Sequence, residues 1–387
     1  MREKICAVVL GGYINGYSII RELNEKKVPD ILLFDTRKSI SAYSNKITKF
    51  ELIDESPVSL LKALKKFEKL YSYLVIFPTD DTHLENLYKL YPEIQSFCNV
   101  PINFKNFKEC VTKQYQYLCC EKLGVPYPKT VYIEKISDCD QLSTLQLPII
   151  IKPNKRKDLG IEVFRNLQIY SKDELKNIHE RIQPFLEQQL SFLASEIIPG
   201  DGSNIYAYIG YRNKKGEILN EWTGKKLSQF PHNFGVFSSA SNQAPDVVRE
   251  QGRCLLQGMD LFGIAEPEFK YDFRDGKFKL MEINLRSMMW HRVGNLSGVN
   301  IQFTQYLDAI GEKPVMQTQI KDIDIHFVYF KHELYNLLTR KKYLKIFYNN
   351  IYCSGRTFFA VLDIYDIMPF FADIRDLFYR ILKGEIR

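Results

Sequence analysis

Four polar side chains near position 280 form the clearest chemical pattern in the sequence. Glu282, Asn284 and Arg286 alternate with apolar residues, so we expect them on one face of a strand. Asp275-Gly276 predicts a hairpin turn, and the strand before it carries Glu268 on a face that can lie opposite Glu282 and Asn284. Two carboxylates and an amide oxygen suit Mg²⁺, and a neighbouring arginine suits a phosphate oxygen. The alternative is an exposed, charged hairpin face.

Two lysines and a strand end offer further groups for a nucleotide. Lys152 belongs to a short β-branched strand expected at 147–153, which would hold its ammonium group firmly against a phosphate. Lys113 lies in a helical stretch, where a solvated surface lysine is the ordinary case. The segment 195–201 ends a strand at Pro-Gly, so its backbone beside two isoleucines can hold a planar base and Asp201 can meet ribose hydroxyls. A plain strand-turn is the alternative there.

A glycine turn follows the first expected strand. Gly11, Gly12 and Gly16 allow a tight turn and a close approach of a ligand to a helix N-terminus. Asp35 lies near the spacing expected for an acid that binds ribose, which makes a nicotinamide oxidoreductase a competing hypothesis. The glycine spacing is G-G-x-x-x-G rather than G-x-G-x-x-G, and a purely structural turn is also compatible with it.

Composition sets the class of protein. The chain has 387 residues, a formal net charge of +7, 45% hydrophobic and 26% charged residues. These values are typical of a globular chain of two to three domains, and the spread-out charge does not favour nucleic acid. No apolar run approaches the roughly 18 residues that span a bilayer, and no signal peptide is recognisable. The eight cysteines show no C-x-x-C pair, so we expect reduced thiols and a cytoplasmic protein.

The order of expected elements indicates the fold class. Strands at 5–10, 31–34 and 73–77 alternate with helices up to 27 and at 57–70, which predicts a doubly wound parallel sheet. Further helices are expected at 106–123, 171–183 and 245–260, and strands at 130–133, at 147–153 and across most of 191–280. The tail from about 315 is rich in Tyr and Phe. Its basic stretch 340–345 could meet an anionic membrane or a lipid-linked glycan, whereas a layer packed on the core or a dimer contact is the alternative.

Taken in order, these motifs resemble those of the ATP-grasp superfamily of ligases over roughly residues 1–312. Lys113 and Lys152 match the family's two lysines, the segment 195–200 matches its adenine hinge, and Glu268, Glu282, Asn284 and Arg286 match its E…E-x-N-x-R metal signature. Within the superfamily, the arrangement most resembles carboxylate–amine ligases of the D-aspartate ligase type. Each motif is modest by itself, but their order and spacing together are specific.

The resemblance implies an α/β and α+β chain of four parts. A Rossmann-like preATP-grasp domain would occupy 1–108, and the two-subdomain ATP-grasp fold would follow as subdomain A at 109–194 and subdomain B, with the metal site, at 195–312. A C-terminal extension would fill 313–387. In one departure from the family, the loop expected over the phosphates, 155–160, is basic and has a single glycine.

The resemblance also implies roles for individual residues. Lys113, Lys152 and Lys225 would bind ATP phosphates, Glu196 with Ile197 and Ile198 the adenine, and Asp201 the ribose. Glu268, Glu282 and Asn284 would hold one or two Mg²⁺. Arg286, Lys226 and His291 would act in catalysis, His291 either as a base for the amine or as an orienting group. The substrate would be bound by Gly11, Asn15, Thr79, Asp80, Asp81 and Asn295, although Thr79 or Asp80 could instead cap a helix.

The resemblance therefore implies an ATP- and Mg²⁺-dependent ligase. It would join a carboxylate to an amine, one of them an amino acid, through an acyl-phosphate, and release ADP and phosphate. A nicotinamide oxidoreductase that uses the glycine turn and a non-catalytic nucleotide-binding module are the alternatives. Small molecules are the expected partners, with no nucleic acid, no membrane contact and a homodimer as one possible assembly.

Overall fold

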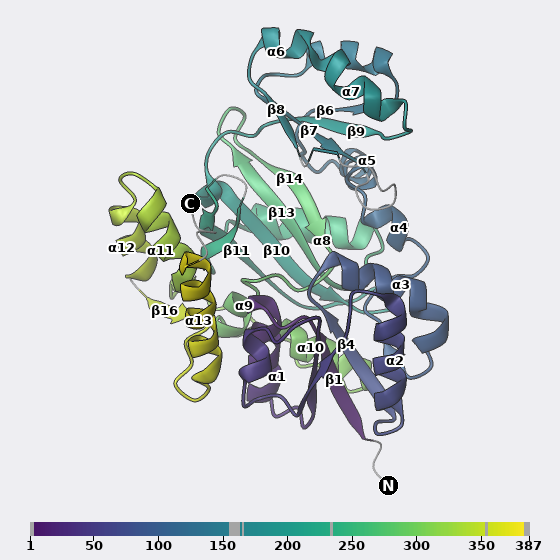
Figure 1. The fold of residues 1–387 in the computed structure, drawn as a ribbon, viewed down its shortest axis with the longest axis vertical. Coiled ribbons are helices and arrows are strands. Elements are labelled where there is room, and N and C mark those ends of the chain that lie inside the picture. The colour runs from purple at the N-terminus through teal and green to yellow at the C-terminus, as the bar shows by residue number, and fades with distance from the viewer. Residues whose placement is uncertain (1–3, 155–162, 165, 233–234, 353–354, 383–387) are drawn as a thin grey trace. The chain divides into compact units, whose positions relative to one another are not determined.

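The computed structural model describes residues 4–154, 163–164, 166–232, 235–352 and 355–382 (Figure 1). The chain forms two compact units. The larger unit comprises residues 1–107, 201–268 and 283–387, and the smaller unit comprises 108–200 and 269–282. The basic segment at 155–160, which the sequence places over the phosphates, lies outside the described residues.

The larger unit begins with a parallel sheet of strand order β3-β2-β1-β4-β5. Its strands are β1 (Ile5–Leu10), β2 (Ile31–Asp35), β3 (Lys49–Leu52), β4 (Tyr73–Pro78) and β5 (Cys98–Asn99), and its helices are α1 (Ile14–Glu25), η1 (Ile40–Tyr43), α2 (Pro57–Glu68) and α3 (Asp81–Ile94). The chain winds outward from β1 to β3 and then returns to build β4 and β5 on the other side. This confirms the doubly wound sheet, whose switch point lies between β1 and β4.

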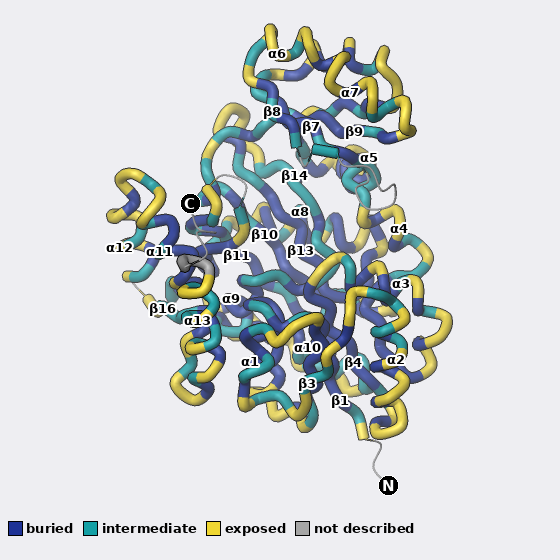
Figure 2. Tube along the Cα trace, in the orientation of Figure 1, coloured by how far each residue is buried: buried dark blue, intermediate teal, exposed yellow. Residues whose placement is uncertain are grey.

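Alternating residues of β1 explain why this sheet is covered on both faces. Cys6 and Val8 pack in a core with residues of α2 and α3, whereas Ala7 and Val9 pack in another core with residues of α1. Strands buried on both faces need apolar residues throughout, and β1 and β2 are buried along nearly their whole length. Figure 2 shows buried segments in the interior of this unit and exposed ones at its rim.

The second sheet of the larger unit has the order β14-β13-β10-β11-β12-β15-β16. Its strands are β10 (Ile205–Arg212), β11 (Ile218–Phe230), β12 (Val236–Ser241), β13 (Gly263–Asp272), β14 (Lys277–Asn284), β15 (Ile325–Val328) and β16 (Arg356–Phe359), accompanied by η3 (Gly202–Asn204), α8 (Asp246–Gly258), α9 (Arg292–Leu296) and α10 (Ile301–Ala309). The turn between β13 and β14 contains Gly276 at φ +70°, as the Asp-Gly pair predicts. The part of this hairpin that contains the turn, residues 269–282, belongs to the smaller unit.

The C-terminal segment packs on the rest of the larger unit. It contains β15 and β16 of the second sheet and the helices α11 (Phe330–Thr339), α12 (Leu344–Ile351) and α13 (Met368–Leu382). Glu333 of α11 is fully buried and accepts hydrogen bonds from the hydroxyls of Ser228, Ser238 and Ser239 on the sheet. The tail is therefore a layer on the core, and no described helix is long and apolar enough to cross a membrane.

The smaller unit is built on a sheet of order β6-β9-β7-β8. Its strands are β6 (Thr130–Ile133), β7 (Ile149–Pro153), β8 (Leu167–Ile169) and β9 (Phe192–Glu196), and its helical elements are α4 (Phe107–Cys110), α5 (Lys113–Leu123), η2 (Ile136–Thr144), α6 (Lys172–Lys176) and α7 (Ile178–Leu186). The single helix expected at 106–123 is two helices. The hydroxyl of Thr112 accepts a hydrogen bond from the Tyr115 N–H and so starts α5 as its N-cap, while Gly124 ends it at φ +68°.

Candidate functional site

The glycine turn lies at the switch point of the parallel sheet, where ligands of doubly wound sheets bind. Gly11 has φ +86°, and a Cβ atom there would lie 2.3 Å from Oγ1 of Thr79, so only glycine fits. Asp35 at the end of β2 accepts hydrogen bonds from the N–H of Gly12 at 2.9 Å and from the hydroxyl of Ser39 at 2.5 Å. Asp35 therefore braces the turn, and its contacts give no support to the ribose role that a nicotinamide enzyme would need.

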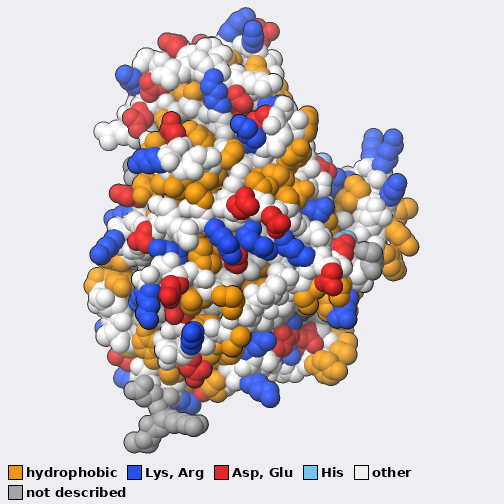
Figure 3. Space-filling view, turned by 180° about the vertical axis from the view of Figure 1, so that it is seen from behind, with side chains coloured by type: hydrophobic (Ala, Val, Ile, Leu, Met, Phe, Trp, Pro, Cys, Tyr) orange, Lys and Arg blue, Asp and Glu red, His pale blue; other side chains and the backbone are white. Residues whose placement is uncertain are grey.

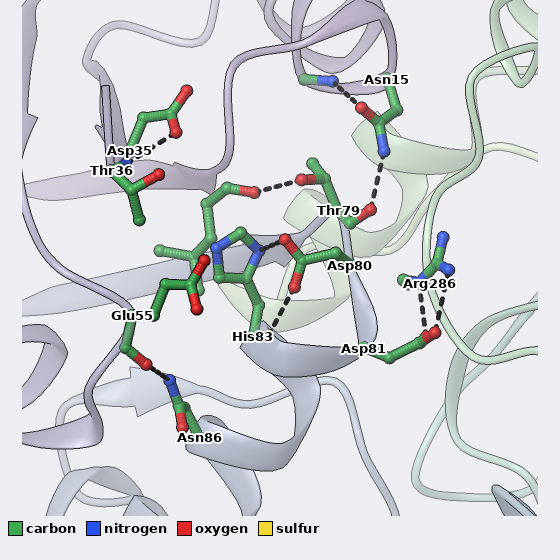
Figure 4. A network of polar contacts seen from close by, with 12 residues as sticks. Asn15, Asp35, Thr36, Glu55, Thr79, Asp80, Asp81, His83, Asn86 and Arg286 are labelled. Carbon is green, nitrogen blue, oxygen red and sulfur yellow. Dashed lines mark hydrogen bonds and ion pairs between the residues drawn. The ribbon is translucent and has the colours of Figure 1, made fainter. Parts of the chain in front are cut away.

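Polar residues after β1 and β4 meet at this edge of the sheet (Figure 4). Asn15 donates from Nδ2 to the Thr79 carbonyl at 2.7 Å, and the Thr79 hydroxyl donates to the Leu10 carbonyl at 2.6 Å. Asp80 is the N-cap of α3 and accepts from the His83 N–H at 2.7 Å, so Asp80 rather than Thr79 caps this helix. Asn15, Thr79, Asp80 and Asp81 thus lie at one edge of the sheet, and their role in binding a substrate stays a prediction.

Arg286 joins this edge from the residues that follow β14. Its Nε lies 2.7 Å from Oδ1 of Asp81. Burial disfavours the charged guanidinium, but the hydrogen bond and the charge of Asp81 outweigh it and raise the pKa of Arg286. Arg286 is therefore a permanent cation beside Asp81.

Lys226 and Glu268 form a buried ion pair in the larger unit. Nζ of Lys226 on β11 lies 2.5 Å from Oε2 of Glu268 on β13, and both side chains are almost completely buried. The register of β11 against β12 shifts between Lys226 and Ser228, a bulge that changes how the strand aims its side chains. Lys225, the next candidate on the same strand, is half-buried.

A second lysine–glutamate pair lies within the smaller unit. Nζ of Lys113, at the start of α5, lies 3.0 Å from Oε2 of Glu282 and also donates to the Met281 carbonyl at 3.2 Å. The Tyr117 hydroxyl donates to the same carbonyl at 3.1 Å. These contacts fix α5 to β14 and hold a lysine beside the second glutamate of the signature.

The expected adenine hinge and Lys152 lie on neighbouring strands of the smaller unit. Lys152 on β7 is the register partner of Leu193 on β9, and Glu196 ends β9. Oε1 of Glu196 accepts from the Gln146 N–H at 2.9 Å, and the Ile197 N–H donates to the Pro148 carbonyl at 2.9 Å. Ile198 is buried. The described contacts therefore hold the hinge backbone in an extended form.

Asp201 begins the return of the chain to the larger unit. Its carboxylate accepts from the Ser203 N–H at 2.9 Å and from the Ser203 hydroxyl at 2.6 Å. Burial raises the pKa of Asp201, but the two Ser203 hydrogen bonds outweigh it and lower the pKa overall. Asp201 is therefore an ionised acceptor for a hydroxyl group.

His291 has a carboxylate partner that the motif analysis did not assign. Its Nε2 lies 2.5 Å from Oε2 of Glu266, and both side chains are buried. Its Nδ1, the second oxygen of Glu266 and the indole nitrogen of Trp290 are buried without a hydrogen-bond partner in the described part of the chain. Alternation along β13, which places Glu266 on the face of Glu268, was the available signal for this residue. Nδ2 of Asn295 donates a hydrogen bond to Oδ1 of Asn300.

The side chains expected at the metal site, Glu268, Glu282 and Asn284, carry oxygen donors of the kind that Mg²⁺ prefers. Glu268 and Glu282 each lie against a lysine ammonium, so both carboxylates already bind a cation. The amide nitrogen of Asn284 is buried without a partner among the described residues. This N–H group is a donor, so Mg²⁺ would be bound by the amide oxygen. No group of three His, Cys, Asp or Glu residues that could hold a metal ion gathers in the described ranges.

Comparison with curated proteins gives one match over most of the chain. The D-aspartate ligase of Enterococcus faecium (strain Aus0004) is 24% identical over 335 residues, which are 82% of this chain and 79% of that protein. The N5-carboxyaminoimidazole ribonucleotide synthase of Aquifex aeolicus is 22% identical over 207 residues, 53% of each chain. No protein-family profile matches the sequence.

Solved structures share the fold at low sequence identity. N5-carboxyaminoimidazole synthetase from Staphylococcus aureus, also solved with ADP, aligns with a TM-score of 0.63 at 14% identity and covers 83% of this chain and 81% of its own. The biotin carboxylase domain of the Hydrogenobacter thermophilus 2-oxoglutarate carboxylase, solved with MgADP and bicarbonate, aligns with a TM-score of 0.61 at 13% identity and covers 80% and 70%.

Proposed function

This chain belongs to the ATP-grasp superfamily, and we propose that it is an ADP-forming ligase that joins a carboxylate to an amine, with an amino acid as one substrate. The similarity to D-aspartate ligase and to enzymes solved with ADP and MgADP supports ATP and Mg²⁺ as its cofactors. One structural observation carries the proposal: each glutamate of the expected metal signature, Glu268 and Glu282, is held next to a lysine. These pairs provide the alternating charges that a polyphosphate and its cation require.

We assign a nucleotide-binding role to residues of each unit taken separately. In the smaller unit, Lys113 and Lys152 would bind phosphates, and Glu196 with the backbone of 197–198 would bind the adenine. In the larger unit, Lys225 would bind a phosphate and Asp201 the ribose, since its carboxylate is an ionised acceptor. Glu268, Glu282 and Asn284 would hold Mg²⁺, which supplies charge neutralisation at the β- and γ-phosphates when bound.

The proposed reaction has two steps. A carboxylate oxygen attacks the γ-phosphorus of ATP, the bond to the β-phosphate oxygen breaks, and ADP leaves with that electron pair. The amine nitrogen then attacks the acyl carbon, inorganic phosphate leaves, and the nitrogen loses a proton. Arg286 and Lys226 would stabilise the negative charge of the transferring group, because both are fixed cations held by carboxylates.

His291 is suited to receive the amine proton. Glu266 lies against Nε2, and Nδ1 has no hydrogen-bond partner among the described residues. A carboxylate that orients a histidine in this way also stabilises the imidazolium that forms. The unpartnered Nδ1 supports this role over a purely structural one.

We place the amino-acid or carboxylate substrate at the switch-point edge of the parallel sheet. Gly11 leaves room for a close approach there, and Asn15, Thr79, Asp80 and Asp81 offer amide, hydroxyl and carboxylate groups. Asn295 is assigned to the acceptor side. The seven cysteines that the structure describes are not joined in disulfides, which supports a cytoplasmic location, and a homodimer stays a prediction.

Product analysis with Mg²⁺-ATP tests the proposal. Pairs drawn from a panel of D- and L-amino acids should release ADP and phosphate, and Glu282→Ala should abolish this release. Glu250→Ala removes an exposed glutamate of α8 and serves as the matched control, with full turnover expected. Release of AMP and pyrophosphate, or full turnover by Glu282→Ala, would contradict the proposal.

A further inference from the structure

A pocket of about 280 Å³ opens within the larger unit where α13 packs against η1. Its lining includes Tyr13 after the glycine turn, Arg37 and Lys38 between β2 and η1, Tyr43 of η1, and Arg375 of α13. None of these residues belongs to the ligase site proposed above. The pocket is therefore lined by residues between the glycine turn and η1 on one side and by residues of α13 on the other.

Buried polar contacts fix the two walls of this pocket to each other. The carboxylate of Asp366, just before α13, accepts from the Tyr17 hydroxyl at 3.0 Å, the Ser44 hydroxyl at 2.5 Å and the Asn45 N–H at 3.0 Å. Arg21 of α1 donates to the Ala360 carbonyl at 2.7 Å. The pocket is thus preformed, which lowers the entropic cost of binding a ligand.

The charge of the lining favours an anion. Arg37 and Lys38 are exposed, and neither forms an ion pair within the described ranges. Arg375 donates one hydrogen bond, at 2.8 Å, to the Tyr43 hydroxyl, out of the five N–H groups of a guanidinium. On the face that Figure 3 shows, basic side chains lie among acidic ones apart from one basic group near the centre.

The two acids in the lining, Asp373 and Asp376, share one lysine. Asp373 accepts from Nζ of Lys331 at 3.1 Å, and Asp376 accepts from the same ammonium group at 2.7 Å. Asp373 also accepts from the Tyr329 hydroxyl at 2.8 Å. One ammonium offsets one of the two carboxylate charges, so Arg37, Lys38, Arg375 and Lys331 together leave a net charge of +2, four cations less two acids.

The N-terminus of α1 adds to this positive field. Tyr13 is the N-cap residue of this 12-residue helix, makes no side-chain cap, and is followed by no acid in the first turn. The positive end of the helix dipole consequently lies at the pocket wall.

We propose that this pocket binds a small phosphate monoester. A phosphate carries close to two negative charges and three acceptor oxygens, which matches three cations better than a single carboxylate does. The volume lies just below the range of about 300–1,000 Å³ typical of drug-sized ligands, so the ester is smaller than a nucleotide. Its carbon body would lie against Tyr13 and Ile40.

Calorimetric titration at fixed ionic strength tests the proposal. Glycerol 3-phosphate and ribose 5-phosphate are the probes, and glycerol, ribose, sulfate and aspartate are the comparison ligands. The phosphate esters should bind and the comparison ligands should not. The double variant Arg37→Ala, Lys38→Ala should weaken binding by about tenfold or more per cation, since hydrogen bonds to charged groups contribute on this scale. Lys214→Ala, Lys215→Ala removes another adjacent, exposed lysine pair and should bind like the wild type.

Two outcomes would overturn the proposal. Equal binding of sulfate or aspartate would show that the pocket does not recognise a phosphate ester, and unchanged affinity in the Arg37/Lys38 variant would show that the probe binds elsewhere. Neither side chain has an ion-pair partner in the described residues, so this variant should keep its unfolding temperature. Binding does not require turnover, so the test is independent of the ligase assignment.

A turnover assay then separates two sources of the ester. If the bound ester is a ligase substrate, mass spectrometry should find it consumed in step with ADP release. If it is a regulator, ADP release should change while the ester is recovered intact. Both outcomes support the pocket and differ only in what the ester does.

Discussion

The two lysine–glutamate pairs, one in each unit, have the same chemistry and different surroundings. Lys226 and Glu268 of the larger unit lie 2.5 Å apart with side chains 8% and 9% exposed. Lys113 and Glu282 of the smaller unit lie 3.0 Å apart and are 28% and 41% exposed. A buried pair is part of the folded core, because each charge depends on the other in a medium of low dielectric constant. A half-exposed pair can exchange its partner for a ligand at little cost in stability.

Removal of Lys226 should therefore have the largest effect. Lys226→Met leaves Glu268 buried without its cation and should lower the free energy of unfolding by about 3–5 kcal/mol, with loss of turnover. Urea unfolding measures the stability. The double variant Lys226→Met, Glu268→Leu should recover most of that stability and stay inactive. A single variant as stable as the wild type would contradict the burial argument.

Removal of Lys113 should separate activity from stability. Lys113→Met should change the free energy of unfolding by less than about 1 kcal/mol, because its pair with Glu282 is half-exposed. The KM for ATP should rise by about tenfold or more if this lysine binds a phosphate, on the scale of a charged hydrogen bond. Steady-state kinetics and urea unfolding on one preparation give both values. A stability loss equal to that of Lys226→Met would remove the distinction between the pairs.

The same contrast shows what the sequence can predict. Alternation along β13 and β14 correctly placed Glu268 and Glu282 on strands joined by a hairpin, since a period of two needs only local residues. It could not show that Lys226 is the partner of Glu268, 42 residues away. A periodic pattern specifies the face of a strand, whereas tertiary packing selects the group that meets it.

The same difference between local sequence patterns and tertiary contacts is found in other parts of the molecule. The doubly wound sheet was predictable because β1, β2 and β4 are short apolar runs followed by turn signals, whereas β3 and β5, which are short and lack such a run, were not predicted. The division of the helix expected at 106–123 was not predicted, because a threonine such as Thr112 is compatible with a helix interior and with an N-cap position. The contact of Asp366 with Tyr17 joins positions 349 residues apart, and no local signal records it.

In the larger unit, a buried carboxyl group, Glu22, should make the free energy of unfolding depend on pH. Burial raises the pKa of Glu22 to about 8, from an ordinary value of 4.5, although the Phe303 N–H donates to it. The folded state then binds more protons than the unfolded state, so stability falls as pH rises from about 4.5 to 8, by at most about 1.4 kcal/mol per unit. Glu22→Gln should flatten this slope in unfolding curves between about pH 5 and pH 8. Glu250→Gln, an exposed control, should keep it, and an unaltered slope in Glu22→Gln would contradict the argument.

Asp272, in the smaller unit, should make stability depend on pH in the opposite direction from Glu22. The fully buried carboxylate of Asp272 lies 2.6 Å from Nη2 of Arg274 and 2.8 Å from Nζ of Lys279, and hydrogen bonds from these cations lower its pKa despite its burial. A lowered pKa contributes stability that is complete above the unfolded value of 3.8 and is lost as pH falls below it. Asp272→Asn should therefore cost about 2 kcal/mol at neutral pH, and this difference should shrink in acid. Hydrogen exchange of the β13 and β14 amides measures the effect locally. A difference that grows in acid would mean that pairing with these cations does not stabilise the hairpin.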